Sequence, residues 1–94
     1  IFLLSITEAE KYFSSDEARK CASTAYAKRQ GVWTSSDFTT AGGEATCWWW
    51  LRTPGFDVSD AAGVSYDGAV SYDGLGVNNV NFGVRPALWI DLNS

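Results

Sequence analysis

The spacing of hydrophobic and polar positions changes several times along the chain, and each change predicts a new element. Residues 1–4 form a continuous apolar run, which predicts a central strand buried on both faces. Ser5 stands three residues before Glu8, the spacing of a capping box, and apolar residues recur at helical intervals as far as Phe13. A first short helix is therefore expected after the strand.

The same capping signature recurs at Ser14 and Glu17, where a second helix is predicted to begin. The apolar positions of this helix follow the spacing i, i+3, i+4 and i+7, and they are Ala18, Cys21, Ala22 and Ala25. The helix is expected to end near Gly31. This prediction places Cys21 on the buried face of a helix.

Residues 34–47 are rich in Ser, Thr and Gly and show no periodicity, so a loop is expected there. The aromatic content from Trp48 to Arg52 predicts a strand. Strand alternation puts Trp48 and Trp50 on one face and Trp49 and Leu51 on the other, with at least one indole half exposed. Core packing is the favoured role of these indoles, and a carbohydrate platform is the alternative.

Two copies of one short motif follow, six residues apart, at residues 64–68 and 70–74. Each copy places an Asp-Gly pair among β-forming residues, which predicts a meander with a tight turn at both pairs. The last stretch of the chain alternates strictly between apolar and other residues, which predicts a half-buried strand. The positions expected on its buried face are Val84, Pro86, Leu88, Ile90 and Leu92.

Composition and charge limit the classes of function. The 94 residues suffice for one small domain, and no apolar run is long enough to span a membrane. The net charge of -4, without a cluster of Lys or Arg, argues against a nucleic-acid partner. The chain has no His, the commonest general base and transition-metal ligand. We therefore expect a binding module that uses no cofactor or metal, not an enzyme.

The two cysteines, Cys21 and Cys47, fit neither a zinc site with four ligands nor a CxxC redox motif. A disulfide between them would close a loop of about 26 residues and contribute roughly 3 kcal/mol to stability. The alternative is a pair of buried free thiols that act as small hydrophobic side chains. The sequence leaves both alternatives open.

Between Gly55 and Gly83 the residue types narrow to Gly, Ala, Ser, Asp, Asn, Tyr, Phe, Val and Leu. Every one of them can be encoded by a codon that ends in a pyrimidine, which is the set reached when the adenines of an Asn codon are randomised. An ordinary turn region rich in Gly, Asp and Asn is the alternative explanation. In both cases Tyr, Ser, Gly and Asn suit molecular recognition, as they do in antibody paratopes.

Four segments of the chain resemble the C-terminal half of a domain of unknown function that is abundant in gut bacteria and related to the C-type lectin fold. These segments are residues 2–5, 8–13, 49–55 and 84–90. Some relatives are variable proteins of diversity-generating retroelements, in which adenine-directed mutagenesis diversifies the C-terminal part of a C-type lectin fold. The resemblance implies that the diversified, ligand-binding positions are Phe56, Asp57, Val58, Ser65, Tyr66, Ser71, Tyr72, Asn78, Asn79, Asn81 and Phe82.

The resemblance also implies limits. Family domains usually have a further N-terminal portion, and the chain begins at Ile1 without any Met, so we expect a C-terminal fragment that needs the missing portion or a partner chain to complete its fold. Calcium-dependent lectins use a Trp-Asn-Asp motif, which this chain does not contain. The carboxylates that could still offer oxygen ligands are those of Asp57, Asp60, Asp67 and Asp73. Turn formation explains Asp67 and Asp73 better, so no metal is expected.

The predicted fold class is α+β of C-type-lectin type, in which two helices pack on a small twisted, mainly antiparallel sheet with a long loop and hairpin region. Residues 1–94 form a single domain. Within it, residues 1–33 supply the first strand and the helices, residues 34–47 a loop, and residues 48–94 the Trp-rich strand, the hairpins and the final strand. Arg52 and Arg85 are expected to fix this frame through hydrogen bonds to carbonyl or carboxylate oxygens.

The predicted function is the non-enzymatic binding of a protein or glycan ligand, with a protein or peptide preferred, at the extracellular face or cell surface. One alternative is an oxidase that resembles the formylglycine-generating enzymes, which share the fold and use paired cysteines, here Cys21 and Cys47. A second alternative is a purely structural domain of a surface protein.

Overall fold

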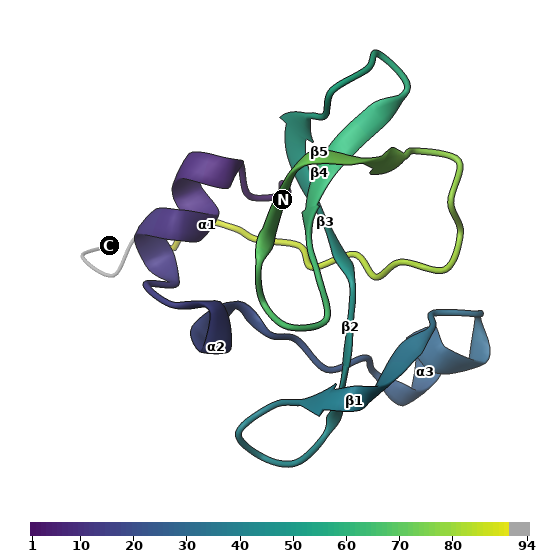
Figure 1. The fold of residues 1–94 in the computed structure, drawn as a ribbon. Coiled ribbons are helices and arrows are strands. Elements are labelled where there is room, and N and C mark those ends of the chain that lie inside the picture. Colours follow the sequence, from purple (N-terminus) through teal and green to yellow (C-terminus); the bar gives the residue numbers. More distant parts are fainter. Residues whose placement is uncertain (91–94) are drawn as a thin grey trace.

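The computed structural model describes residues 1–90, within which three short helices accompany two antiparallel sheets (Figure 1). The helices are α1 (Ile6–Tyr12), α2 (Asp16–Arg19) and α3 (Ala25–Arg29). The two-stranded sheet consists of β1 (Thr34–Thr39) and β2 (Ala45–Cys47). The three-stranded sheet has the order β3-β4-β5, with β3 (Trp49–Pro54), β4 (Asp60–Val64) and β5 (Val70–Gly76). The α+β class is confirmed.

No helix in this described part of the chain combines the length and the apolar content that crossing a membrane would require.

The first helix begins where its capping box predicts. The backbone N–H of Glu8 donates to Ser5 Oγ at 3.1 Å, and the backbone N–H of Ser5 donates to Glu8 Oε1 at 2.9 Å. These two bonds satisfy donors that have no partner inside the helix. Ala9, on the inner face of α1, is fully buried in the core.

The second helix is not continuous, so that prediction is wrong. Ser15 rather than Ser14 caps α2, and Thr24 caps a separate helix, α3. Carbonyl groups at the end of α2 and after it accept hydrogen bonds from other parts of the fold instead of continuing the helix. Trp49 Nε1 donates to Arg19 O at 3.0 Å, and the Cys47 N–H donates to Cys21 O at 2.8 Å. Cys21 therefore lies in an extended segment instead of on a helix face.

The region predicted as a loop forms the β1-β2 hairpin instead. Its register pairs Thr34 with Cys47 and Thr39 with Ala45. The turn closes through a bond of 2.8 Å from the Thr40 N–H to Glu44 O. Ser and Thr residues are compatible with a strand when its backbone forms hydrogen bonds with a partner strand. Their abundance alone was therefore not a sound basis for predicting a loop.

The Trp-rich strand is confirmed as β3, with the predicted alternation of its faces. Trp49 and Leu51 are each 1% exposed and join the core with residues of α1 and β4. Trp48 and Trp50 lie on the other face, where both rings contact Phe82. Trp50 is the half-exposed indole of this face.

The two Asp-Gly pairs behave differently. The first forms the β4-β5 turn, in which the Gly68 N–H donates to Ser65 O at 3.0 Å and Gly68 has a φ of 88°. The second lies inside β5, where Gly74 has a φ of 71° and sits at a shift of the β4-β5 register. A Cβ on Gly74 would lie 2.0 Å from Ala61 O, so glycine is needed for close backbone approach, and the second predicted turn is wrong.

The first residues do not form the predicted central strand. Phe2 makes one isolated bridge, in which it exchanges bonds of 2.8 Å and 2.7 Å with Ala87, while Ile1 is exposed. Leu4 O accepts a bond of 2.9 Å from the Arg52 N–H, so this segment does lie beside β3.

The final segment does not form the predicted strand. Within residues 83–90 only Gly83 and Ala87 make isolated bridges, to Trp49 and Phe2, and the inward-facing and outward-facing residues are the reverse of those predicted. Ala87 pairs with Phe2, and Arg85 stacks on Phe13 and Trp49, which fixes these two residues inward. A shift of one residue exchanges the faces of a strand. The residues predicted to be buried are therefore exposed, and they are Val84, Pro86, Leu88 and Ile90. Leu92 lies outside the described residues.

Candidate functional site

Two loops lie at the same end of the strands of the three-stranded sheet. Residues 55–59 connect β3 to β4, and residues 77–82 follow β5 (Figure 1). The loops adjoin because Asp60 pairs with Gly76 and the Val77 N–H donates to Ser59 O at 2.9 Å. We call the exposed side chains of residues 56–58 and 77–80 the two-loop surface, which comprises Phe56, Asp57, Val58, Val77, Asn78, Asn79 and Val80.

The backbone of the first loop is fixed from several sides. The Gly55 N–H donates to Asp60 O at 2.9 Å, and the Phe56 N–H donates to Asp73 O at 2.8 Å. A Cβ on Gly55 would lie 2.3 Å from Asp73 O, so only glycine allows this approach of the loop to β5. The side chain of Asp57 accepts a further bond of 2.7 Å from the Val58 N–H. The loop therefore holds its side chains on an ordered backbone.

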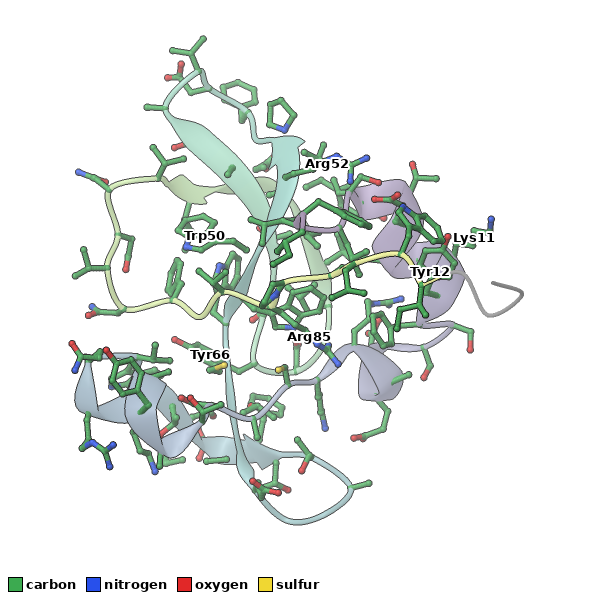
Figure 2. All side chains as sticks on the ribbon, turned by 180° about the vertical axis from the view of Figure 1, so that it is seen from behind. Lys11, Tyr12, Trp50, Arg52, Tyr66 and Arg85 are labelled. Atoms are coloured by element: carbon green, nitrogen blue, oxygen red, sulfur yellow. The ribbon has the colours of Figure 1, made fainter. Side chains whose placement is uncertain are left out.

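The second loop is anchored at both of its ends. The Asn79 N–H donates to Gly76 O at 3.1 Å, and Asn81 O accepts a bond of 2.9 Å from the Trp33 N–H. Phe82 then packs against Trp48 and Trp50, with ring centroids 5.0 Å and 5.1 Å away. Figure 2 shows Trp50 inside the curve of this loop. Phe82 thus anchors the loop and is not part of its exposed face.

The side chains of the two-loop surface are mainly apolar and exposed. Phe56 is 86% exposed, Val58 is fully exposed, and Val80 is 81% exposed. Asp57 supplies the only ionisable group in the set, while Asn78 and Asn79 supply neutral amides. Sequence reasoning selected Phe56, Val58 and the asparagines but missed Val77 and Val80, although both lie in the compositionally narrow stretch.

The other predicted site residues lie outside the two-loop surface. Ser65 and Tyr66 belong to the β4-β5 turn at the opposite end of these strands, and both are half-buried. Ser71 is half-buried within β5. Asn81 is exposed beside Trp33, whose ring packs edge-on against Tyr66 with centroids 5.2 Å apart. The eleven predicted positions therefore do not form one surface.

The two tyrosines among the predicted positions, Tyr66 and Tyr72, are held by packing or hydrogen bonding. Burial of the Tyr66 hydroxyl, with a smaller contribution from the nearby Cys47, raises the pKa of Tyr66 above its ordinary value. Tyr72 is exposed on β5, and its hydroxyl donates a hydrogen bond to the Glu10 carboxylate of α1, which raises the pKa of Tyr72. Tyr72 therefore links β5 to α1 in addition to exposing its ring.

The two arginines of the frame act differently. Arg52 Nη1 donates to Leu3 O at 2.9 Å and also to the Glu8 carboxylate, as predicted. Arg85 instead lies between the rings of Phe13 and Trp49, at 4.7 Å and 4.8 Å, and within residues 1–90 its buried Nη1 has no hydrogen-bond partner. Figure 2 shows Arg85 in the middle of the molecule and Arg52 beside β3.

In the region that the structure covers, no three Cys, Asp or Glu side chains come close enough together to share a metal ion. Asp67 serves the β4-β5 turn, where its Oδ1 accepts a bond of 3.0 Å from the Ala69 N–H.

Comparison with known proteins identifies one family. No curated protein and no solved structure matches the chain. A family described as a domain of unknown function (DUF6273) matches residues 1–92, which is nearly the whole chain. The protein therefore belongs to the DUF6273 family.

Proposed function

We propose that this protein is a non-enzymatic binding module that recognises a protein ligand through the two-loop surface. The observation that carries the proposal is the exposure of Phe56, Val58, Val77 and Val80 on two loops joined by the Val77–Ser59 hydrogen bond. Apolar side chains gathered in this way, with polar residues beside them, are typical of interaction sites.

The fixed backbone beneath the side chains supports the same proposal. Binding costs less free energy when the contact groups are already ordered. Here the glycine at position 55 and the packed ring of Phe82 hold the two loops before any ligand arrives. The mostly apolar character favours a protein or peptide over a glycan, because sugars need more hydrogen-bonding groups than Asp57, Asn78 and Asn79 provide.

We infer further that the frame is C-type-lectin-like and that the loops are diversified by a retroelement. The exposed positions among the predicted diversified residues are the ones that can change without disturbing the core, and they are Phe56, Asp57, Val58, Tyr72, Asn78, Asn79 and Asn81. The encoding DNA and its neighbourhood test this inference. A nearby near-copy of the segment for residues 55–90, differing only at adenines, supports it, and a neighbourhood without such a copy contradicts it.

A peptide library displayed on phage tests the binding proposal directly. The protein is immobilised, peptides are selected, and their affinities are measured for a Phe56→Ser, Val58→Ser double variant. Because each buried apolar side chain contributes about 1.5–3 kcal/mol, the loss of two should weaken binding at least about 100-fold.

The matched control is Tyr26→Ser, which removes an exposed aromatic side chain from α3 instead. We expect the selected peptides to bind this variant as they bind the parent. Equal binding to the parent and to the double variant would locate the peptides elsewhere and would contradict the proposal.

A further inference from the structure

Both cysteines of the chain face one pocket, which is separate from the two-loop surface. The pocket has a volume of about 240 Å³ and lies between α3, β2 and the segment after Phe82. Its lining includes Cys21, Cys47, Trp49 and Arg85. None of the residues of the two-loop surface lines this pocket.

The backbone places the two cysteines opposite each other. Ala22 and Thr46 form an antiparallel bridge, and the Cys47 N–H donates to Cys21 O at 2.8 Å. Opposed residues in such a pair have Cα atoms roughly 5.5 Å apart and side chains on the same face. That separation is also typical of a disulfide, so the backbone pairing is compatible with a bridge between the two sulfurs.

The two thiols differ in exposure and in acidity. Cys47 is 3% exposed, whereas Cys21 is partly exposed. The neighbouring Cys47 side chain lowers the pKa of Cys21 to about 6, with a smaller contribution from the charge of Arg85. The same interaction, together with burial, raises the pKa of Cys47. The pair thus combines a partly exposed, more acidic thiol with a buried, less acidic partner, as in a dithiol that attacks and then resolves.

We propose that Cys21 and Cys47 form a redox-active dithiol that reduces a small disulfide and closes into an intramolecular bridge. The Cys21 thiolate attacks one sulfur of the small disulfide, the bond between its sulfurs breaks, and one thiolate leaves. Cys47 Sγ then attacks Cys21 Sγ, displaces the second thiolate and gives up its proton to it. The two protein sulfurs are oxidised to a disulfide, and the small disulfide is reduced to one thiolate, which takes up a proton from water, and one thiol.

The neighbouring residues suit this chemistry. A Cβ on Gly83 would lie 3.2 Å from Cys47 Sγ, so glycine leaves this sulfur room to rotate. Arg85 brings a positive charge whose buried Nη1 is not engaged by any described acceptor, and this charge favours the thiolate of Cys21. Arg85 therefore acts as a positioning residue, through the charge state of Cys21.

Oxidised glutathione is the probe for the test. The reduced protein is incubated with oxidised glutathione, and the reaction is quenched with an alkylating reagent. The mass of the intact protein is then measured by mass spectrometry. We expect the parent to lose the mass of two hydrogen atoms, to resist alkylation, and to melt at least about 10 °C higher than its reduced form. Cys47→Ser should stop at the mixed disulfide with one glutathione, and Cys21→Ser should stay unmodified because Cys47 is buried.

Two results would overturn the proposal. In the first, the parent keeps two alkylatable thiols in the oxidising buffer. In the second, the parent ends as a mixed disulfide or as a dimer linked through cysteine.

The role of Arg85 has its own readout, the pH profile of the first step. The rate should rise with a midpoint near pH 6, the value to which the pKa of Cys21 is lowered. Arg85→Lys, which keeps the charge, should preserve this profile, whereas Arg85→Met should move the midpoint to higher pH. Identical profiles for the two variants would show that Arg85 contributes packing alone.

Discussion

Gly68 offers a stringent test of how α2 is docked on the β4-β5 turn. Alanine at Gly68 would adopt a φ of 88°, and its Cβ would lie 1.7 Å from Asp16 O. The matched control is Gly43, which has a φ of 83° and no atom within 4 Å of the added Cβ. Left-handed backbone costs an alanine roughly 1–2 kcal/mol at either position. Only the substitution at Gly68 also displaces α2.

Displacement of α2 breaks a specific bond. Arg19 Nε donates to Gly68 O at 3.0 Å, and a hydrogen bond from a charged group is worth about 1.5–3 kcal/mol. We therefore expect Gly68→Ala to lose about 2.5–5 kcal/mol and Gly43→Ala about 1–2 kcal/mol. A domain of this size has only about 5–14 kcal/mol of stability, so the Gly68 variant should unfold at markedly lower denaturant.

Urea unfolding followed by tryptophan fluorescence measures both losses, with the slope of the transition checked for constancy. Failure of Gly68→Ala to fold, while Gly43→Ala folds normally, agrees with the same reasoning. Equal losses in the two variants would refute it, because the contact between α2 and the turn would then contribute nothing.

Two other predictions concern the frame. Trp49→Phe should cost about 1–3 kcal/mol more in urea unfolding than Trp48→Phe, because Trp49 Nε1 bonds to Arg19 O while the buried Trp48 Nε1 has no partner in residues 1–90; equal costs would contradict this. The backbone N–H of Ser5, followed by the Arg52 side chain, lowers the pKa of Glu8 from 4.5. A carboxyl group whose pKa is lower in the folded state stabilises the folded protein at pH values above its unfolded-state pKa. This stabilisation is lost as the pH falls through the folded-state pKa. Thermal melts of Glu8→Gln should therefore show a flatter acid limb, and an unchanged limb would exclude this role.

Local signals in the sequence predicted the elements whose stabilising contacts are themselves local. The capping box of Ser5 and Glu8 and the alternation of Trp48 to Leu51 each combine a short motif with one buried face. The turn at the first Asp-Gly pair, which contains Gly68, was predicted correctly for the same reason. These features needed no knowledge of distant residues.

Long-range contacts decided the places where the prediction failed. The predicted second helix ends at Arg19 because Trp49, thirty positions away, takes its carbonyl group. The faces of the final segment are reversed because Phe2 pairs with Ala87, and periodicity alone cannot show which face a partner will cover. The site was predicted in part: composition marked the stretch that contains both loops, but only the fold separates exposed Phe56 from anchoring Phe82.

An amide-resolved NMR titration with a peptide selected on the immobilised protein tests the central claim most directly. We expect the chemical-shift changes to concentrate in residues 55–59 and 77–80, while amides of the β1-β2 hairpin and of α3 stay unchanged. Shifts centred on the hairpin, or around Trp33 and Tyr66, would contradict the assignment of the two-loop surface as the binding site.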